Sequence, residues 1–515
     1  MPAVIASSVP STRPAFPALS VSASASAARS DRPATRARTG HRPGRALAGG
    51  LLGIATWLGA LAFAGAAAAQ VLPPGVDAAL ARAKVPREAV TLLVADADGA
   101  RAPRLAWRPQ APMNPASIMK VVTTYAGLDL LGPAFAWTTP VHVDGPVRDG
   151  VLQGNLYIQG QGDPRLVAER LWLLLRRVQG LGIQTIAGDI VLDRQAFETA
   201  EADPAAFDGE GLRPYNAGPD ALLVNFKSVV ATFVPDRGAE VARVSWEPAL
   251  AGVAMQATVP LAAGECGDWQ TALAADLADP SRLRFAGGYI AACGERTWGV
   301  AYAEPRTFAA RAIAGAWAQM GGQVRGQVRD GRVPAGSKPV FEVASPPLSE
   351  VIRDINKYSN NVMAQQLFLT LGLQQKRRGT LEASRAVMRQ WWSERIGGDD
   401  DAPVFDNGSG LSREERISAG ALARMLQVAW RSPVMSELMA SLPAAGVDGT
   451  LRRRALRSGG SAHLKTGTLR DAAGVAGFVD GASGRRYVVV AIANHANAAA
   501  ARPAFDALVD WAVQD

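Results

Sequence analysis

The sequence predicts a mixed α/β (α+β) protein in which a domain of helices and strands is interrupted by a large, mainly β insert. Three observations support this prediction. The first part of the chain and the end of the chain combine apolar strands with amphipathic helices. Residues 141–340 instead contain short apolar runs separated by Gly and Pro, which are typical of strands and turns. Helical spacing then returns from residue 346 to residue 439.

Before the insert, the pattern predicts a short helix over 76–83, a strand over 89–95 and its hairpin partner over 104–107. A longer helix is then expected to begin at Asn114, which is a good N-cap residue. Pro115 would occupy the first helical position, where its missing N–H is not needed. This helix would carry the first chemically interesting residues of the chain.

Within the insert, one helix-like run over 167–180 interrupts the predicted strands. After the insert, several helices lead to three apolar strands, expected over 463–469, 474–481 and 485–494. A last helix is predicted over 503–514, where apolar residues recur at helical spacing. The chain therefore ends in a strand, strand, strand, helix order.

Residues 1–69 are predicted to form a disordered basic leader followed by a secretory signal peptide. Ala46–Ala69 contains no charged residue, follows an Arg-rich flank and ends in small residues, which places a cleavage site near Ala69. The alternative is an uncleaved membrane anchor, because about 24 uncharged residues can span a bilayer. Cleavage would place the mature protein in the periplasm, with membrane association at most through an uncleaved segment.

The formal net charge of +8 does not indicate a nucleic-acid partner. The first 45 residues hold seven Arg and one Asp, so they contribute +7 − 1 = +6 and leave +2 for the rest of the chain. In an exported protein, the two cysteines, Cys266 and Cys293, are expected to form a disulfide, worth about 3 kcal/mol on the chain-entropy model. No metal-ligand cluster and no phosphate loop is recognisable in the sequence, so no metal and no cofactor are expected.

Lysine is rare in this chain, since seven of the 54 basic residues are Lys and the rest are Arg. One lysine, Lys120, stands three residues after Ser117, and side chains at this spacing share one face of a helix. A serine hydroxyl needs a base to become a nucleophile. A buried lysine can lose its proton and act as that base, whereas arginine cannot. The pair predicts a serine nucleophile with a lysine base, although S-x-x-K alone is more simply explained by a surface lysine.

Two further motifs follow in order and favour a catalytic serine–lysine pair over a surface lysine. Ser359–Asn361 reads SNN at the junction of two predicted helices, and Lys465–Gly467 reads KTG on a predicted strand. S-x-x-K, S-x-N and K-T-G in this order form the signature set of the penicillin-recognising serine enzymes. None of the four His lies in a nucleophile motif, so a Ser-His-Asp triad is not predicted.

With these motifs in place, most of Val76–Asp515 resembles the D-alanyl-D-alanine carboxypeptidases and endopeptidases of the class C low-molecular-mass penicillin-binding protein type (the PBP4 or DacB type, peptidase family S13). The resemblance includes the segments PASIMKVVTTYAGLDLLGP, GNLYIQGQGDPRL, DNGSGLSR and LKTGTLRDAAGVAGFV. The long stretch between Ser117 and Ser359 looks like the domains that this family inserts between its first two motifs.

The resemblance implies a serine β-lactamase/penicillin-binding-protein transpeptidase-like fold. The catalytic domain would be discontinuous, formed by 70–140 and 341–515, with a five-stranded antiparallel sheet flanked by helices and a helical lobe. The insert, 141–340, would be mainly β and would comprise two subdomains. The active site would lie between the sheet edge that carries Lys465 and the helical lobe that carries Ser359.

The resemblance also implies roles for the matching residues. Ser117 would be the acylated nucleophile and Lys120 its base. Ser359 would pass a proton to the nitrogen of the leaving D-alanine. Asn361 would hold the substrate amide and face the lysine base. Lys465 would supply positive charge to the terminal carboxylate of the peptide.

The third motif would contribute further contacts. The hydroxyls of Thr466 and Thr468 would help to bind the carboxylate, and the backbone N–H groups of Ser117 and Thr468 would form the oxyanion hole. Gly467 would allow the peptide to lie along the strand as an added β-strand. Asn360 departs from the Asp that many members have, and little consequence is expected because this side chain does not point at the substrate.

Two residues outside the motifs are candidate substrate contacts. Arg413, in DNGSGLSR, matches a family position that can contact the charged end of a diaminopimelate side chain, and a loop-bracing salt bridge is the equally good alternative. Leu469 would line the same side-chain pocket or belong to the core.

The implied function is that of a serine-type D-Ala-D-Ala carboxypeptidase, and of a DD-endopeptidase, acting on peptidoglycan stem peptides and acylated by β-lactams at Ser117. A β-lactamase is the nearest alternative, but the sequence lacks the E-x-x-L-N segment that would supply a deacylating base of the class A type. A non-catalytic penicillin-binding sensor is the other alternative, but the presence of all three complete motifs favours an active enzyme. The resemblance leaves a homodimer open.

Overall fold

The computed structural model describes residues 71–199, 203–454, 456 and 459–515. The predicted leader and signal peptide, 1–69, lie outside the described residues. Within the described ranges, no helix is both long enough and apolar enough to cross a membrane.

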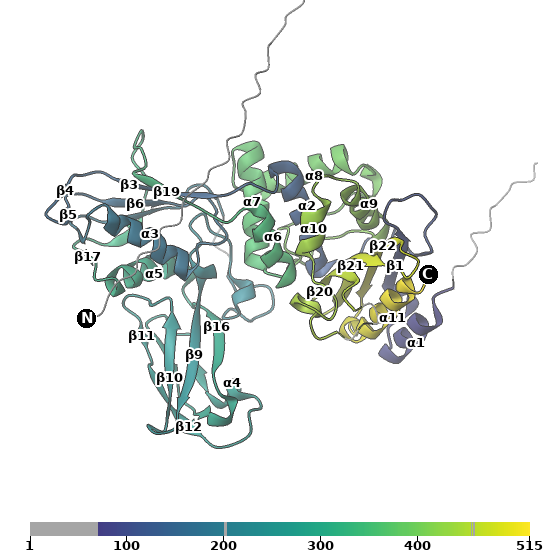
Figure 1. The fold of residues 1–515 in the computed structure, drawn as a ribbon, viewed down its shortest axis with the longest axis horizontal. Helices are drawn as coiled ribbons and strands as arrows, with labels where there is room; N and C mark the ends of the chain where they lie inside the picture. Colours follow the sequence, from purple (N-terminus) through teal and green to yellow (C-terminus); the bar gives the residue numbers. More distant parts are fainter. Residues whose placement is uncertain (1–70, 200–202, 455, 457–458) are drawn as a thin grey trace, which may run out of the picture. The chain divides into compact units, whose positions relative to one another are not determined.

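A five-stranded antiparallel sheet joins the two ends of the chain, in the order β2–β1–β22–β21–β20 (Figure 1). Its strands are β1 (Val90–Asp96), β2 (Leu105–Trp107), β20 (Ala462–Thr468), β21 (Ala472–Asp480) and β22 (Arg486–Asn494). The predicted N-terminal hairpin and the three predicted C-terminal strands thus form one sheet. β20, which carries the third motif, is an edge strand whose outer side is bridged to the segment 443–445 at Ala462–Leu464 and can accept an added strand beyond that point.

Both faces of this sheet are covered by helices, which explains why its strands are nearly continuous apolar runs. The helices α1 (Pro74–Ala83) and α11 (Arg502–Val513) pack on one face, and α9 (Ala419–Trp430) packs on the other. Successive residues of a strand point to opposite faces, so Leu93 enters the core beneath α9 and Val94 enters the core beneath α11.

A helical lobe surrounds α2 (Met119–Leu131). Its other helices are α6 (Leu348–Lys357), α7 (Asn361–Lys376), α8 (Leu381–Arg395) and α10 (Met435–Ser441). All residues of α2 from Met119 to Leu128 are buried, so this helix is enclosed on every side and forms the centre of the lobe. A lysine in such a helix lies in the protein interior.

The first part of the insert contains two sheets, ordered β18–β8–β6–β3–β19 and β17–β7–β5–β4. Figure 1 labels six of these strands: β3, β4, β5, β6, β17 and β19. The strands of these sheets are β3 (Thr138–Val143), β4 (Val147–Arg148), β5 (Val151–Leu152), β6 (Leu156–Gln159), β7 (Thr185–Ile186), β8 (Ile190–Asp193), β17 (Gln323–Val324), β18 (Val328–Asp330) and β19 (Phe341–Ala344). Two helices, α3 (Ala168–Gly180) and α5 (Pro305–Gln319), belong to the same core. The sequence predicted α3 but not α5, whose Ala-rich and Gly-containing run lacks a clear polar face.

The second part of the insert contains the sheets β15–β12–β10–β9–β16 and β11–β14–β13, with the short helix α4 (Trp269–Ala272). The strands of these sheets are β9 (Ser228–Asp236), β10 (Val241–Glu247), β11 (Ala254–Met255), β12 (Thr258–Ala262), β13 (Ala275–Asp276), β14 (Arg282–Phe285), β15 (Tyr289–Ile290) and β16 (Arg296–Ala301). Stacked and edge-on aromatic rings centred on Phe233 fill its interior.

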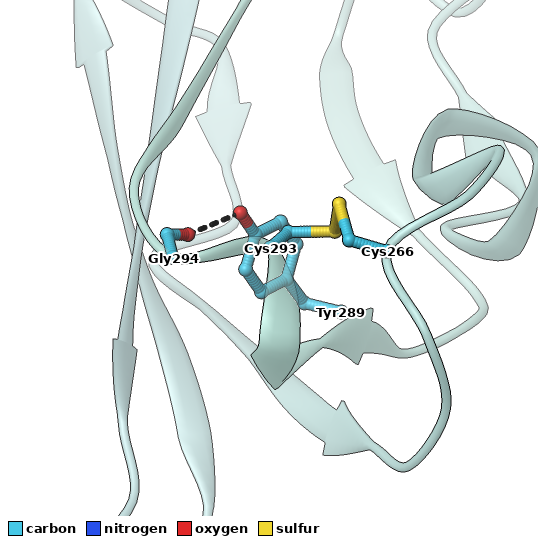
Figure 2. Close-up of a disulfide and its surroundings, with 4 residues drawn as sticks. All are labelled: Cys266, Tyr289, Cys293 and Gly294. Carbon is cyan, nitrogen blue, oxygen red and sulfur yellow. Dashed lines mark hydrogen bonds between the residues drawn. A yellow bond between two sulfur atoms is a disulfide. The ribbon is translucent and has the colours of Figure 1, made fainter.

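The predicted disulfide is present in the insert, where the sulfur atoms of Cys266 and Cys293 are 2.09 Å apart (Figure 2). Next to it, the hydroxyl of Tyr289 donates a hydrogen bond to the carbonyl of Gly294 at 2.6 Å. The bridge therefore fastens the loop before α4 to the turn that follows β15.

Candidate active site

Ser117 lies in a 3-10 turn, Ala116–Ile118, directly before α2. The predicted helix start at Asn114 is wrong, because Ala116 adopts φ = 48° and interrupts the helical conformation there. Asn114 still satisfies a backbone donor, since its Oδ1 accepts the N–H of Ala116 at 2.9 Å. The turn leaves Ser117 half-buried at the mouth of a pocket, with α2 beginning two residues later.

Lys120, in the first turn of α2, is fully buried and its amine contacts the two other functional groups expected near it. Its Nζ lies 2.9 Å from Ser117 Oγ and donates to Asn361 Oδ1 at 2.6 Å. It also donates to the carbonyl of Ser409. The structure therefore brings the predicted nucleophile and base into direct contact.

The surroundings of Lys120 favour a neutral amine. Burial, and after it the positive charge of Lys465, lower the pKa of Lys120 well below its usual value, while the carboxylate of Glu415 opposes this shift. A neutral amine has a lone pair, so it can accept a proton from the neighbouring hydroxyl.

Ser359 lies in the turn between α6 and α7 and has φ = 58°. A non-glycine residue in this left-handed region costs about 1–3 kcal/mol and persists only where its surroundings hold it. Here the Nζ of Lys465 donates to Ser359 Oγ at 2.9 Å. It also donates to the backbone carbonyl of Thr466, the next residue of β20, at 2.7 Å. Lys465 is fully buried on β20, and burial lowers its pKa to about 7.

The two asparagines of the second motif have different tasks. Asn360 Oδ1 accepts the N–H of Met363 at 3.0 Å, so this side chain caps α7 and points away from the reacting groups. Asn361 accepts from Lys120 through Oδ1, and its Nδ2 donates to the carbonyl of Tyr215 at 3.0 Å. A residue of the insert therefore fixes the orientation of the amide that contacts the lysine.

Two glycines let neighbouring segments approach the Ser117 turn. A Cβ on Gly467 would lie 2.6 Å from the carbonyl oxygen of Pro115, and a Cβ on Gly410 would collide with the carbonyl of Ala116. Gly467 is in β20, so its lack of a side chain brings the edge strand against the nucleophile turn.

The first and second motifs and Thr468 from the third border a pocket of about 490 Å³. The pocket is lined by Ser117, Phe207, Asp208, Tyr215, Tyr358, Ser359, Asn361, Leu411, Arg413, Thr468, Leu469 and Arg470. The two buried lysines contact this pocket only through Ser117, Ser359 and Asn361.

Three lining residues come from the insert, and the sequence did not predict them. The ring of Phe207 lies under the Arg413 guanidinium, and the guanidinium carbon is 4.8 Å from the ring centroid. The backbone carbonyl of Phe207 also accepts a hydrogen bond from Arg413 Nη2 at 3.2 Å. Asp208 accepts from Tyr215 Oη at 3.0 Å and from Asn216 Nδ2 at 2.7 Å. Arg413 thus lines the pocket and is held by Phe207 of the insert, and its contact with a substrate stays a prediction.

Leu469 is half-buried and lines the same pocket, so it is a wall residue rather than part of a buried core. Asp208 is the acidic residue of the pocket. Burial raises its pKa, but hydrogen bonds from Glu210 N–H, Asn216 and Tyr215 outweigh burial and hold the pKa of Asp208 below its usual value. The pocket therefore presents the carboxylate of Asp208 and the guanidinium of Arg413, which packs on the ring of Phe207.

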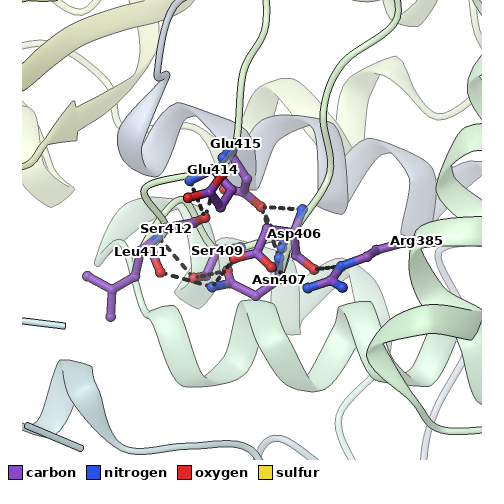
Figure 3. Close-up of polar contacts among 9 residues, drawn as sticks. Arg385, Asp406, Asn407, Ser409, Leu411, Ser412, Glu414 and Glu415 are labelled. Atoms are coloured by element: carbon purple, nitrogen blue, oxygen red, sulfur yellow. Dashed lines mark hydrogen bonds and ion pairs between the residues drawn. The ribbon is translucent and has the colours of Figure 1, made fainter. Parts of the chain in front are cut away.

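The sequence also did not predict a role for Glu415, which is fully buried behind the 406–409 turn. Figure 3 shows its carboxylate directed at the backbone of Asp406 and Asn407. Its Oε1 accepts the N–H groups of Gly408, Asn407 and Asp406 at 2.8, 3.2 and 3.4 Å. Burial, opposed by these hydrogen bonds and assisted by the charge of Asp406, raises the pKa of Glu415 to about 7.

The same turn presents two carbonyl groups to α2. Gly408 O accepts from Thr123 Oγ1 at 2.7 Å, and Ser409 O accepts from Lys120 Nζ. Glu415 therefore fixes the 406–409 turn, and this turn positions the amine of Lys120 through the carbonyl of Ser409. No spacing in the sequence reveals this link, because it runs through the backbone of a loop.

The comparisons with known proteins agree with the geometry. The sequence model described as the D-Ala-D-Ala carboxypeptidase 3 (S13) family matches residues 73–515. A D-alanyl-D-alanine carboxypeptidase of Actinomadura sp. (strain R39) is 29% identical over 394 residues, which cover 72% of this chain and 71% of that protein. The D-alanyl-D-alanine carboxypeptidase DacB of Haemophilus influenzae is 26% identical over 399 residues, covering 74% and 80%.

The crystal structure of penicillin-binding protein 4 (dacB) from Haemophilus influenzae superposes with a TM-score of 0.68 at 22% identity, covering 85% of this chain and 99% of that chain. A second structure of that protein, complexed with a β-lactam, gives a TM-score of 0.60 at 23% identity, covering 82% and 93%. These likenesses confirm the predicted fold. Together with the family match, which spans nearly all of the described residues, they confirm the predicted resemblance: the chain belongs to the D-Ala-D-Ala carboxypeptidase 3 (S13) family.

Proposed function

We propose that this protein is a serine-type D-Ala-D-Ala carboxypeptidase that cleaves peptidoglycan stem peptides through an acyl-enzyme on Ser117. The observation that carries the proposal is the fully buried amine of Lys120, 2.9 Å from Ser117 Oγ and with a lowered pKa. In this proposal the catalytic domain is formed by 70–140 and 341–515, and 141–340 is its insert. The export signal predicted over 1–69 directs the protein to the periplasm.

Acylation begins when the neutral amine of Lys120 takes the proton of Ser117 Oγ as this oxygen attacks the carbonyl carbon of the scissile D-Ala-D-Ala bond. The carbonyl oxygen gains the negative charge and is stabilised by the backbone N–H groups of Ser117 and Thr468, both of which border the pocket. Because β20 is an edge strand, the peptide can lie along it in extended form and bring its carbonyl to this position.

Collapse of the intermediate breaks the C–N bond, and the leaving nitrogen of D-alanine needs a proton. Ser359 Oγ supplies it and is supported by Lys465 Nζ, which donates to that oxygen at 2.9 Å. Asn361 keeps Lys120 in place and offers an N–H group to the substrate amide. The proton that Lys120 took in acylation replaces the one that Ser359 gave up, so the amine is neutral again. Water then attacks the ester on Ser117 while Lys120 accepts a proton of that water, and this proton passes to Ser117 Oγ as the ester bond breaks.

The pocket also favours a particular substrate side chain. Asp208 and Arg413 present opposite charges, with Phe207 and Leu469 as apolar wall residues. A side chain that ends in both an ammonium and a carboxylate, as diaminopimelate does, would be matched by this pair. We therefore include Arg413, Leu469 and Asp208 in the substrate site.

A labelling and release experiment tests the proposal. Purified protein and the Ser117→Ala variant are incubated with a fluorescent penicillin, with a pentapeptide muropeptide and with a crosslinked muropeptide dimer. The proposal predicts covalent labelling and release of D-alanine, both lost in the variant, and cleavage of the dimer would add the DD-endopeptidase activity.

Three outcomes contradict the proposal. Rapid penicillin hydrolysis without D-alanine release would indicate a β-lactamase. Labelling without turnover of any peptide would indicate a penicillin-binding sensor. Labelling that persists in Ser117→Ala would place the acyl group on another residue.

A further inference from the structure

Among the described residues, three aromatic side chains line the Ser117 pocket, and one of them differs from the other two. Phe207 lies under the guanidinium of Arg413, and the hydroxyl of Tyr215 donates to a carboxylate at 3.0 Å. Tyr358 is instead 73% exposed, and no ring contact, ion pair or hydrogen bond engages its side chain within the described part of the chain. Single exposed aromatic residues are common, so the place of this one, at the mouth of a substrate pocket, is what distinguishes it.

The backbone that carries Tyr358 is fixed, although its ring has no partner. At the end of α6, the N–H of Tyr358 donates to the carbonyl of Asp354 at 3.2 Å. The preceding residue, Lys357, is half-buried, and its Nζ donates to Asp448 Oδ2 at 2.6 Å and to the carbonyl of Leu442 at 2.7 Å. The ring therefore projects from a defined position on the rim of the pocket.

Tyr358 lies next to the residue that handles the leaving group. Its chain neighbour Ser359 supplies the proton to the leaving nitrogen in the proposed mechanism, and both residues line the same pocket. The Cα atoms of consecutive residues are about 3.8 Å apart, so a group bonded to the leaving nitrogen comes within reach of the Tyr358 side chain. The charged side-chain site proposed above is formed by other segments, which carry Asp208 and Arg413.

The two reactions considered for this enzyme differ in the amine that leaves. The carboxypeptidase reaction releases D-alanine, whose α-carbon carries a methyl group. The DD-endopeptidase reaction breaks the same kind of C–N bond, but the leaving amine belongs to the side chain of a diamino acid in a second stem peptide. A chain of methylene groups then stands in place of the methyl group. These methylene groups are apolar surface that can be buried against an exposed aromatic ring.

We propose that Tyr358 binds the methylene chain of the leaving diamino acid and thereby determines how well crosslinked dimers compete with D-Ala-D-Ala ends as substrates. This inference rests on the proposed function, because it requires acylation of Ser117 and a proton from Ser359. The ring adds no step to the reaction. It stabilises the bound dimer and its transition state through apolar contact, so it changes the ratio of the two activities rather than the chemistry.

The test compares kcat/KM for cleavage of a crosslinked muropeptide dimer with kcat/KM for release of D-alanine from a pentapeptide muropeptide. In Tyr358→Ala, we expect the ratio of the dimer value to the pentapeptide value to fall about tenfold, since the surface that buries the methylene chain is lost. Tyr358→Phe keeps the ring and should keep the ratio within about twofold. Trp172→Ala is the matched control, because it removes a 49% exposed aromatic side chain from α3, outside the Ser117 pocket, and should leave the ratio unchanged.

A series of synthetic peptides provides a second measurement, for which the wild type is sufficient. Peptides whose last residue is D-alanine, D-norvaline or D-norleucine carry a methyl, a propyl or a butyl group on the leaving amino acid. For the wild type, we expect kcat/KM to rise about two- to fourfold per added methylene group, because full burial of one methylene corresponds to about fourfold. In Tyr358→Ala, this dependence on chain length should disappear.

A Tyr358→Ala enzyme with the wild-type ratio, or a wild type whose kcat/KM does not rise along the series, would overturn the inference. An equal loss in Tyr358→Phe would show that the hydroxyl matters rather than the ring, and would overturn it too. A wild type that releases D-alanine but leaves the dimer intact would overturn the inference and keep the carboxypeptidase proposal. A wild type that neither binds penicillin covalently nor releases D-alanine would instead overturn the proposed function.

Discussion

Two pairs of basic residues lie near the two pockets that Thr468 lines, and they differ in residue type and in burial. Lys120 and Lys465 are fully buried beneath the Ser117 pocket, and burial lowers the pKa of both. Arg454, which is half-buried, and Arg502, which is exposed, border a second pocket of about 250 Å³ that shares Thr468 with the Ser117 pocket. A buried lysine can exchange a proton near neutral pH, whereas an arginine keeps its charge. Lysines therefore occupy the buried positions from which a proton can be exchanged, and arginines occupy the more exposed positions that keep a permanent charge.

The largest expected effect comes from replacing a buried lysine by arginine, the residue type of the other pair. Lys120→Arg places a permanent positive charge at this position and cannot accept a proton, so we expect the rate constant for acylation by a fluorescent penicillin to fall by about 10³-fold or more. Lys338→Arg, at an exposed position in the insert, is the control and should acylate at the wild-type rate. A Lys120→Arg enzyme that keeps a tenth of the wild-type rate would show that this position supplies charge only.

A second prediction concerns the carboxylate behind the lysine pair. The pKa of Glu415 is raised to about 7, so the folded state favours its protonated form. Its contribution to stability is complete below the unfolded pKa, near 4.5, and is lost as the pH rises through 7. Relative to Glu415→Gln, which does not titrate, the free energy of unfolding of the wild type should fall by up to about 3 kcal/mol between pH 4.5 and 8.

Denaturant unfolding at several pH values measures this difference. The matched control is Glu414→Gln, which removes the exposed acid next to Glu415 and should show no such trend. A difference between wild type and Glu415→Gln that does not change with pH would mean that Glu415 titrates alike in the folded and unfolded states.

The smallest expected effect lies in the pocket wall that the insert provides. Asp208→Asn removes the charge opposite Arg413, and we expect kcat/KM for a diaminopimelate-containing pentapeptide to fall about tenfold. Acylation by a penicillin that lacks this side chain should stay within about twofold. An equal loss for both ligands would indicate that Asp208 supports the fold of the loop through Tyr215 and Asn216 rather than the substrate.

The parts of the site that could be predicted from the sequence are those encoded by short motifs. The spacing of Ser117 and Lys120 and the scarcity of lysine indicated their contact, and the structure shows it at 2.9 Å. The terminal strands could be predicted because they are long, apolar runs bounded by turn residues. The exact start of the helix could not, because the left-handed conformation of Ala116 is imposed by the segments packed around it.

The remaining parts depend on contacts between segments far apart in the chain. Asp208 and Tyr215 reach the pocket from the insert, and no local pattern indicates which loop of an insert meets a catalytic serine. No sequence pattern distinguishes Arg454 and Arg502 from the other basic residues, 54 in all, because only the fold brings these two arginines to the threonines of β20. The helix α5 was missed because its small residues contact other elements on several sides, which removes the polar face that predicts a helix.

The most direct test of the central claim is the pH dependence of acylation of the wild-type protein by a fluorescent penicillin, measured under single-turnover conditions from pH 5 to pH 10.5. If Ser117 is activated by a neutral Lys120, the logarithm of the rate constant should rise with pH and level off well below the ordinary lysine pKa of about 10.4. A rate constant that continues to rise with unit slope to pH 10 would contradict the account.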